Sequence, residues 1–507
     1  MDGHGREHAE VRVHDLADKG LRRGSVSLVA AVAIGLAATA PAYSLTGALG
    51  YGALESGYQL PIVFVISVIP MYFVALAYKH MTAVAPDSGT IFTWGAKSIG
   101  PRTGWFGAWG LLLSSVLAGV GAAEIMVNAV TTVAGWDDPP KLARTAIAAA
   151  FILFTTWLVS LGAEESSRTT LGLTIVQYGG LVLFAGILGI AVLRGHAAPT
   201  AEPFSWQWLN PAAIDGWGTL VGGFLVALFI FWGFDASLAM SEESQGTPEQ
   251  AGRTGVIAMM ITLVTYVLFA IAALAYAGID EEDPLSLTHP DAIDDVFTTM
   301  ASQSIGSAGA AVAAVIVGIS AFSATMSTVM PTARGLLAMA TYRALPHRFA
   351  SVDHATQTPR FATWFMGLMT LAIYVGLSLV SEAIVADSVY SVGLSICVYY
   401  TVAALSCAVY FHRTAFASVR TAVSQVILPV IGAGILIWVM IIEAGNMTDP
   451  EYGSGESFLG VGTVFIVGVL TLLLGAPLMI AWNLRDPTFF RGRTLPRERA
   501  HWVRDGR

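Results

Sequence analysis

Apolar stretches about as long as a lipid bilayer is thick recur along almost the whole chain. Of its 507 residues, 55% are hydrophobic and only 12% are charged, whereas soluble domains carry about 25% charged residues. A helix of about 20 apolar residues crosses the roughly 30 Å hydrocarbon core of a membrane. The pattern therefore predicts an all-α integral membrane protein and leaves no stretch for a separate soluble domain.

We expect twelve transmembrane helices, several of them long enough to be tilted. They cover residues 26–50, 58–78, 104–134, 141–161, 169–193, 218–240, 254–278, 307–342, 361–380, 388–411, 422–443 and 457–482. The transmembrane domain is thus residues 25–483, between polar tails at 1–24 and 484–507. The apolar stretch after the first tail is too long for the core of a signal peptide, so we expect that tail to be retained.

Basic residues fall almost entirely on one side of this predicted topology. If both termini are cytoplasmic, all but three of the 26 Lys and Arg residues lie inside, the exceptions being Lys141, Arg144 and Arg194. The outer segment 280–295 carries acidic residues and no Lys or Arg. Because positive charge is kept on the cytoplasmic side, we expect a multi-pass protein of the plasma membrane with both termini cytoplasmic. An Ala-rich composition in which Arg exceeds Lys favours a bacterial membrane.

Two of the predicted spans are interrupted by residues that break helices. In the first span, Pro41 lacks an N–H and biases Ala40 away from helical angles. In the sixth, Gly233 and Asp235 interrupt an aromatic and aliphatic run. Two breaks five spans apart are expected where helices form two inverted five-helix repeats around a site at the bilayer midplane, since freed backbone groups at that depth must meet protein, water or ligand. The alternative is that Pro41 merely kinks a helix.

Four stretches of the chain resemble the amino acid–polyamine–organocation (APC) superfamily of transporters. They are APDSGTIFTWGAKSIGPRTGWFGAWG at 85–110, GAEESSRTT at 162–170, GFDASLAMSEESQGTPEQAGR at 233–253 and RGLLAMATYRALPHRFASVDHATQTPRFA at 334–362. The resemblance implies a leucine-transporter-type fold: a 5+5 inverted repeat with broken helices 1 and 6, plus two peripheral helices. It also implies a substrate held between the broken helices, with walls from helices three, eight and ten, and transport by alternating access.

The resemblance places the substrate at the two breaks. The implied substrate-binding residues are Ala38, Thr39, Ala40, Ala42, Ser115, Gly119, Phe229, Trp232 and Gly233. Many superfamily members have a glycine-rich motif at the first break, whose N–H groups approach a substrate carboxylate. Here Thr39, Ala40 and Pro41 stand in its place, and proline cannot donate. Carboxylate recognition then depends on the neighbouring N–H groups and on the positive end of a half-helix.

Two acidic residues lie well inside the predicted hydrocarbon span, where such residues are costly and often functional. Asp235 matches the acidic position that follows the second break in the superfamily; it either caps the second half-helix or takes part in coupling. The resemblance points one face of the helix that carries Glu124 at the site, and this face comprises Ser115, Ala118, Gly119 and Ala122. Glu124 lies about 180° from Ser115 around the same helix. We expect Glu124 to form a structural hydrogen bond, with Tyr399 or Tyr400 as partner, or to be linked to proton transfer.

Coupling to an ion is left open between H+ and Na+, with H+ favoured, and no other cofactor is expected. Some proton-coupled superfamily members carry a lysine in span five, where spacing places Gln177 here, and glutamine cannot serve as the same charged switch. Ala324, Ser327 and Thr328 reproduce a spacing that sodium-coupled relatives use, and their oxygens suit a hard cation. Ser and Thr are also common packing residues between membrane helices.

The function expected is secondary active transport of an amino acid or related small amine, proton-coupled or driven by exchange. The alternatives are a sodium-coupled symporter of an organic cation or amine, and a transporter-like channel or receptor, which would give current or signalling without accumulation of solute. Neither an enzyme nor an ATP-driven pump is expected, because the sequence has no nucleotide-binding loop and no His/Cys metal cluster. The expected partners are a small-molecule substrate and the lipid bilayer, with no nucleic acid, and the chain is a monomer or homodimer.

Overall fold

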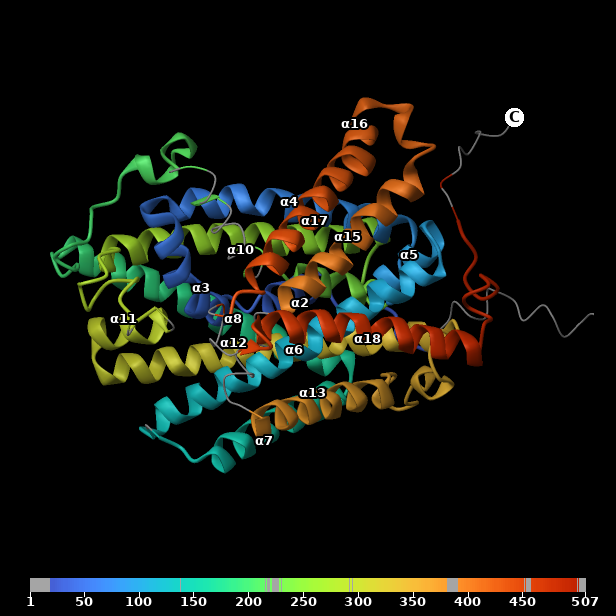
Figure 1. The fold of residues 1–507 in the computed structure, drawn as a ribbon, viewed down its shortest axis with the longest axis horizontal. Helices are drawn as coiled ribbons and strands as arrows, with labels where there is room; N and C mark the ends of the chain where they lie inside the picture. The colour runs from blue at the N-terminus through green and yellow to red at the C-terminus, as the bar shows by residue number, and fades with distance from the viewer. Residues whose placement is uncertain are drawn as a thin grey trace, which may run out of the picture.

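A computed structural model shows the protein as a bundle of long helices (Figure 1). It describes residues 19–500 except 137, 215, 217–218, 221–227, 229, 291, 294, 381–390, 451, 453–456 and 499. Within these residues the only strands are β1 (Ser457–Phe458) and β2 (Val461–Gly462), which pair antiparallel. The protein is thus all-helical, as its composition predicts.

The long helices account for most of the described chain. They are α2 (Leu28–Ala38), α3 (Pro41–Ser56), α4 (Leu60–Val84), α6 (Pro101–Ala134), α7 (Lys141–Val159), α8 (Ala163–Leu193), α10 (Pro248–Ala277), α12 (Ser307–Thr341), α13 (Arg360–Val380), α15 (Val392–Phe411), α17 (Leu428–Asn446) and α18 (Thr463–Arg485). The shorter α-helices are α5 (Ile91–Ser98), α11 (Val296–Ile305) and α16 (Val419–Ala422). The 3₁₀ helices are η1 (Gly57–Gln59), η2 (Trp206–Leu209), η3 (Pro211–Ala213), η4 (Phe234–Met240), η5 (His347–Ala350) and η6 (Ala415–Ala417), and η7 (Val423–Ile427) is a π-helix.

Ten helical segments of the described chain are long and apolar enough to cross a membrane. One of them, Leu28–Val84, is a single run of 57 residues that contains α2, α3 and α4, so it covers the first two predicted spans. The first half of the predicted sixth span falls largely outside the described residues, while residues 230–240 are described. Most other predicted spans coincide with one helix to within a few residues, as α12 does with 307–342.

Local sequence explains where several helices begin and end. Ser27 caps α2 by accepting a hydrogen bond from the Ala30 N–H at 3.1 Å. At the start of α10, Thr247 and Gln250 cap each other's backbone in a capping box, with Pro248 at the first helical position, where no N–H is needed. These caps satisfy backbone donors at the helix starts that have no partner within the helix.

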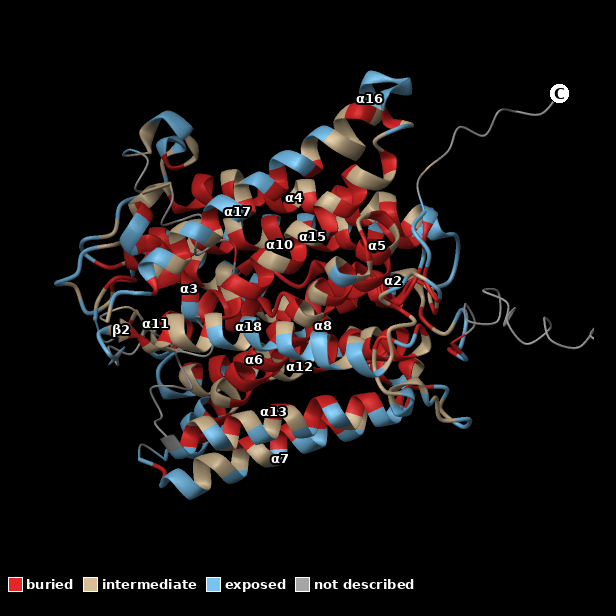
Figure 2. Cartoon of the chain, turned by 45° about the vertical axis from the view of Figure 1, so that its right-hand side comes forward, coloured by how far each residue is buried: buried red, intermediate tan, exposed pale blue. Residues whose placement is uncertain are grey.

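The outer surface of the bundle is apolar. Figure 2 shows exposed residues along the outward faces of α7, α13, α17 and α18, with buried residues between the helices. Large exposed hydrophobic side chains include Leu183, Leu193, Trp157 and Leu470. A soluble protein rarely exposes so much contiguous apolar surface, whereas a helix bundle in lipid requires it.

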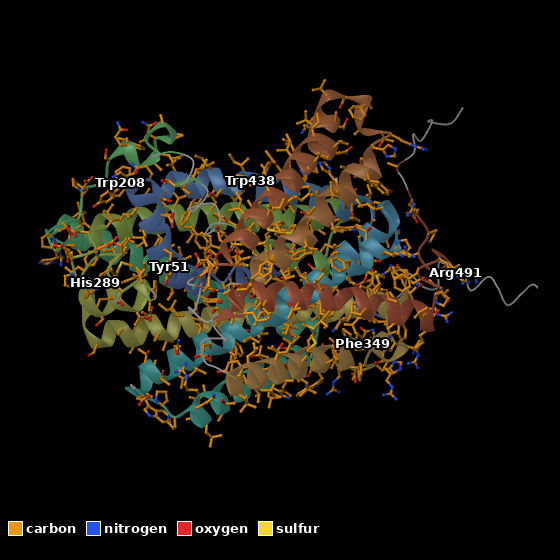
Figure 3. All side chains as sticks on the ribbon, viewed as in Figure 1. Tyr51, Trp208, His289, Phe349, Trp438 and Arg491 are labelled. Carbon is orange, nitrogen blue, oxygen red and sulfur yellow. The ribbon has the colours of Figure 1, made fainter. Side chains whose placement is uncertain are left out.

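The two ends of the bundle differ in the chain segments they carry. Trp208 and His289 lie at one end and Arg491 at the other (Figure 3). At the second end the segment after α18 packs on the bundle: Phe489 stacks on Phe92 with ring centroids 5.0 Å apart, and the Thr494 hydroxyl donates to the Tyr342 carbonyl at 2.6 Å. The first part of the predicted C-terminal tail is therefore folded against the helices.

Candidate functional site

The first predicted break is present, between α2 and α3. Helix α2 ends at Ala38, and Ala40 has left-handed backbone angles, φ 47° and ψ 59°. Pro41 then occupies the first helical position of α3, where its missing N–H costs nothing and its fixed φ suits a helix start. The chain is therefore interrupted for two residues rather than kinked, and Pro41 begins a new helix.

Neighbouring hydroxyl groups meet the backbone oxygen freed by this break. The Thr39 carbonyl accepts hydrogen bonds from Ser44 Oγ at 2.7 Å and from Tyr266 Oη at 3.2 Å. Just beyond it, the Tyr43 N–H donates to Ser320 Oγ at 3.3 Å. Protein groups thus fulfil part of the requirement that buried backbone atoms be paired, leaving fewer main-chain groups for a ligand than the sequence suggested.

The second break touches the first. Gly233 has φ +105°, and a Cβ at this position would lie 2.6 Å from the Ala38 carbonyl oxygen. Only glycine fits, both for its backbone angles and for this close approach. The Gly233 N–H donates to Tyr400 Oη at 3.3 Å, and η4 starts at the next residue. The ends of the two interrupted segments therefore lie backbone against backbone.

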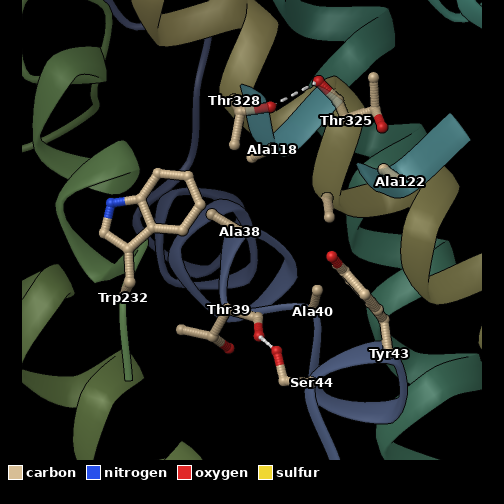
Figure 4. Close-up of a pocket in the computed structure, with 11 residues that line it drawn as sticks. Ala38, Thr39, Ala40, Tyr43, Ser44, Ala118, Ala122, Trp232, Thr325 and Thr328 are labelled. Carbon is tan, nitrogen blue, oxygen red and sulfur yellow. Dashed lines mark hydrogen bonds between the residues drawn. The ribbon is translucent and has the colours of Figure 1, made fainter. Parts of the chain in front are cut away.

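A small cavity lies beside the two breaks, shown in Figure 4. Its volume is about 20 Å³, and it is lined by Ala38, Thr39, Ala40, Tyr43, Ser44, Ala118, Ala122, Trp232, Ala324, Thr325 and Thr328. A cavity of this size has room for roughly one water molecule. Among the described residues, the lining contains no acidic or basic side chain. The chemistry it offers is hydroxyl groups, an indole ring, backbone and methyl groups.

The structure brings most of the predicted residues of the two breaks to this cavity. Ala38, Thr39, Ala40 and Trp232 line it. Gly233 holds the two breaks together without lining the cavity, and Ala42 is fully buried in the first turn of α3. Phe229 lies outside the described residues.

The predicted face of α6, which comprises Ser115, Ala118, Gly119 and Ala122, is divided between the cavity and neighbouring helices. Ser115 is turned toward α12, where its hydroxyl lies 2.7 Å from that of Thr332. Gly119 faces α13, and a Cβ there would lie 3.0 Å from a methyl carbon of Thr370. Ala118 and Ala122, from the same predicted face, line the cavity. The cavity thus takes one edge of that face, while the other edge, about 60° away around the helix, packs against α12 and α13.

Asp235 sits just past the second break, in a group of tyrosines. Its carboxylate accepts hydrogen bonds from Tyr400 at 2.8 Å and from Tyr78 at 3.4 Å. Beside it, Trp232 Nε1 donates to the Tyr399 hydroxyl. Through these hydrogen bonds Asp235 ties α4 and α15 to the segment after the second break.

Glu124 is paired, but not with the partner expected from the sequence. Its carboxylate accepts a hydrogen bond from Tyr374 of α13 at 2.7 Å and forms an ion pair with Arg144 of α7. Arg144 also donates to Asn128 at 3.1 Å. The predicted partners, Tyr399 and Tyr400, belong to the Asp235 network instead. Glu124 therefore joins three helices at the rim of the bundle, away from the cavity.

The residues considered for ion coupling lie between α8 and α12. Gln177 Nε2 donates to Ser323 Oγ at 3.4 Å. Gln177 and Ser327 are fully buried, and neither Gln177 Oε1 nor Ser327 Oγ has a hydrogen-bond partner among the described residues. The Thr328 hydroxyl donates to the Thr325 carbonyl at 3.1 Å, while Ala324 and Thr328 line the cavity.

Sequence reasoning missed the buried tyrosines around both breaks. Tyr78 reaches Asp235, Tyr266 reaches the Thr39 carbonyl, and Tyr178 lies 2.9 Å from the Thr262 hydroxyl. The available signal was their presence inside apolar spans, because a buried tyrosine hydroxyl needs a hydrogen-bond partner. The sequence gives no indication of which partner each one finds.

The fold and the cavity define a multi-pass membrane protein with a small central site between two interrupted helical segments. Comparison with known protein families identifies the family. Residues 25–471 match the family model for amino acid permeases. The chain therefore belongs to the amino acid permease family, within the APC superfamily, as its motifs indicated.

Curated relatives of known activity are permeases and transporters, not enzymes. The branched-chain amino acid permease BcaP of Bacillus subtilis is 26% identical over 63% of this chain and 68% of its own. The vacuolar cationic amino acid transporter 2 of Arabidopsis thaliana is 27% identical over 68% of this chain and 54% of its own, so this chain spans about half of the plant protein. The methylthioribose transporter of Bacillus subtilis is 24% identical over 78% of this chain and 83% of its own.

Proposed function

We propose that this protein is a secondary active transporter that carries an amino acid or related small amine across the plasma membrane by alternating access. The single observation that carries the proposal is the meeting of the two breaks, where Gly233 lies against the Ala38 carbonyl beside a small cavity whose described lining is uncharged. Interrupted helices at the middle of a bundle are the recurrent binding site of secondary transporters. Membership of the amino acid permease family supports the same function.

The proposed architecture has twelve spans, with the first ten in a 5+5 inverted repeat. Supporting it, Leu28–Val84 is long enough to cross twice, and the breaks at Ala40 and Gly233 lie five predicted spans apart. We place both termini in the cytoplasm because the predicted segments on their side of the membrane carry most of the Lys and Arg residues. Consistent with this, Arg491 of the C-terminal segment and His289 of the acidic outer segment lie at opposite ends of the bundle. Glu281→Cys should react with an impermeant maleimide added outside intact cells, whereas Arg491→Cys should not; the reverse pattern overturns the orientation.

The substrate we propose has a small, uncharged side chain. Ala118, Ala122 and Ala324 line the cavity from two helices, and the described lining offers no carboxylate to pair with a cationic side chain. The N-terminal end of α3 lies at the cavity through Tyr43 and Ser44, and its partial positive charge suits a substrate carboxylate.

Uptake into proteoliposomes tests this function directly. Under imposed ion gradients, alanine, serine and valine should accumulate, and arginine should neither accumulate nor compete. Ala122→Phe fills the cavity and should abolish uptake, whereas Ala134→Phe, on the exposed end of the same helix, should leave uptake unchanged. Binding by the purified protein should also raise its apparent melting temperature, because a ligand of the native state stabilises it by mass action. Arginine accumulation, or full activity of Ala122→Phe, contradicts the proposed substrate.

The driving ion we propose is the proton, with Asp235 as the group that carries it, or exchange of one solute for another. The second candidate is sodium, favoured by the buried oxygens of Gln177 and Ser327 that lack partners in the described chain. Uptake measured with sodium and proton gradients imposed separately decides between them. Sodium-driven accumulation that is lost in a Ser327→Ala, Thr328→Ala double variant supports the cation site; sodium-independent accumulation that is lost in Asp235→Asn supports the proton.

A further inference from the structure

The N-terminal segment that precedes α2 is threaded into the bundle end that we assign to the cytoplasm. Although Lys19 belongs to a predicted polar tail, only 1% of its side chain is exposed, against 61% for Arg22 three residues later. A lysine is almost never so buried unless its charge is paired. The burial of Lys19 therefore indicates a specific contact.

The ammonium group of Lys19 lies between two carboxylates from separate parts of the chain. It is 2.9 Å from Asp87 in the loop between α4 and α5, and 2.6 Å from Glu242, which follows η4. It also lies 5.7 Å from the centre of the Tyr342 ring, at the end of α12. One side chain thus ties together three elements that approach the cytoplasmic end of the bundle.

The surrounding groups hold Asp87 in place to receive the lysine. Its Oδ1 accepts from the Gly89 N–H at 2.7 Å and from Thr93 at 2.8 Å, while Tyr342 donates to Oδ2 at 3.0 Å. Burial alone would lower the pKa of Lys19, but the charges of Asp87 and Glu242 outweigh it, and that pKa lies above its ordinary value. Lys19 therefore stays charged at physiological pH.

A second anchor fixes the same segment seven residues later. The Val26 N–H donates to the Glu243 carbonyl at 3.0 Å, and the Gln245 N–H donates to the Val26 carbonyl at 2.8 Å. Glu243 is itself held by a buried ion pair with Arg334 of α12. Residues 19–26 are thus bound to the residues after the second break by a side chain at one end and by backbone at the other.

We propose that residues 19–26 form a cytoplasmic latch, closed by Lys19, that must withdraw before the central cavity opens to the cytoplasm. The inference rests on the proposed function. If η4 moves away from the α4–α5 loop, Lys19 cannot keep both carboxylates. Losing one partner of a largely buried ion pair is unfavourable, so the contact holds η4 and the α4–α5 loop together for as long as Lys19 stays between them. A cavity of about 610 Å³, lined in part by Arg23, Lys97 and Thr247, adjoins the latch and provides the space that its withdrawal would join to the central site.

Cysteine accessibility tests the latch without requiring any substrate. Ala118→Cys places a reporter on the wall of the central cavity, in a background with Cys397→Ala and Cys407→Ala. Inside-out vesicles are treated with an impermeant maleimide. Lys19→Met should raise the labelling rate several-fold, and Arg22→Gln, in the same segment but with an exposed ion pair to Glu164, should leave the rate at the parent value.

A second variant keeps the proposal testable if Lys19→Met does not fold. Glu242→Gln removes one carboxylate and leaves Lys19 with Asp87, so it should raise labelling by a smaller factor. The double variant should not exceed Lys19→Met, because both changes release the same contact. Parent labelling rates in both single variants, or a lower melting temperature with unchanged labelling, overturn the latch. Absence of amino acid uptake with the expected labelling would overturn the transport proposal instead.

Discussion

The two chain breaks use different physical means to leave the helix. At the first, an alanine takes left-handed angles and a proline starts the next helix. At the second, glycine takes φ +105° and a network of tyrosines receives the groups that follow. The first break depends on Pro41, which has no N–H to continue the preceding helix. The second depends on Gly233, which has no side chain to hinder its backbone angles.

We propose that this difference separates two tasks at one site. The first break is closed by neutral hydroxyls, those of Ser44 and Tyr266 on the Thr39 carbonyl. The second is followed by Asp235, whose carboxylate is held by Tyr78 and Tyr400. A neutral break suits the holding of a substrate, whereas a buried carboxylate can change its charge. The comparison teaches that the binding and coupling roles of the site can be assigned to different breaks and tested apart.

The largest effect should come from Gly233→Ala. The new Cβ would meet the Ala38 carbonyl oxygen at 2.6 Å in a backbone conformation that favours glycine, so the breaks must separate. We expect a loss of about 2–4 kcal/mol of folding free energy, measured by thermal unfolding in detergent, and no detectable uptake. Gly434→Ala in α17, where a Cβ meets nothing within 4 Å, should behave as the parent. Full stability of Gly233→Ala would mean that the breaks do not touch.

The next largest effect should be a difference in uptake between variants of the two intramembrane acidic residues, Asp235 and Glu124. Asp235→Asn keeps the shape but removes the charge that two tyrosine hydroxyls stabilise, and should reduce proton-driven uptake on the order of tenfold or more. Glu124→Gln is the matched control, because Glu124 binds Arg144 and Tyr374 away from the cavity. It should keep uptake within about twofold of the parent, since partly exposed ion pairs contribute little. The opposite ranking would make Glu124 the coupling residue.

Local chemistry decided how far the sequence could predict this site. Pro41 and Gly233 act on their own backbone, so both breaks could be located without knowing any neighbour. Which residues of the predicted α6 face reach the cavity could not be located, because the packing of neighbouring helices decides between Ser115 and Ala118, about 60° apart around the helix. The sequence shows small residues on both faces of that helix, and small residues suit helix packing and a cavity lining alike.

Partners across the bundle were the least predictable feature. The position of Glu124 around its helix excludes the cavity face, as expected, but only the packing of α7 and α13 supplies Arg144 and Tyr374. The same holds for Lys19, which reads as part of a solvated tail until the fold brings Asp87 and Glu242 to it. The fold class followed from hydropathy because lipid acts on every span in the same way.

A smaller effect should come from the hydroxyls that close the first break. Tyr266→Phe or Ser44→Ala removes one of two donors to the Thr39 carbonyl, and each should cost about 1 kcal/mol. The double variant should cost more than the sum, because the buried carbonyl then loses both donors. Tyr178→Phe is the control, since the Tyr178 hydroxyl lies against Thr262 and not on this carbonyl. Additive losses in thermal unfolding would indicate that water replaces the missing donors.

The smallest effect should come from Ala40→Gly, which tests whether the first break needs glycine as the second does. Left-handed angles cost an alanine about 1–2 kcal/mol, but glycine adds a loss of backbone entropy of about 0.5–1 kcal/mol. The two nearly cancel, so stability measured by thermal unfolding should change by less than about 1 kcal/mol. Ala40→Val, with a branched side chain that tolerates these angles poorly, should instead destabilise the protein. If Ala40→Gly stabilises the protein by several kcal/mol, the strain at Ala40 is larger than its left-handed angles alone explain. Neighbouring residues must then hold the first break open, because Pro41 alone would not force an alanine into so costly a conformation.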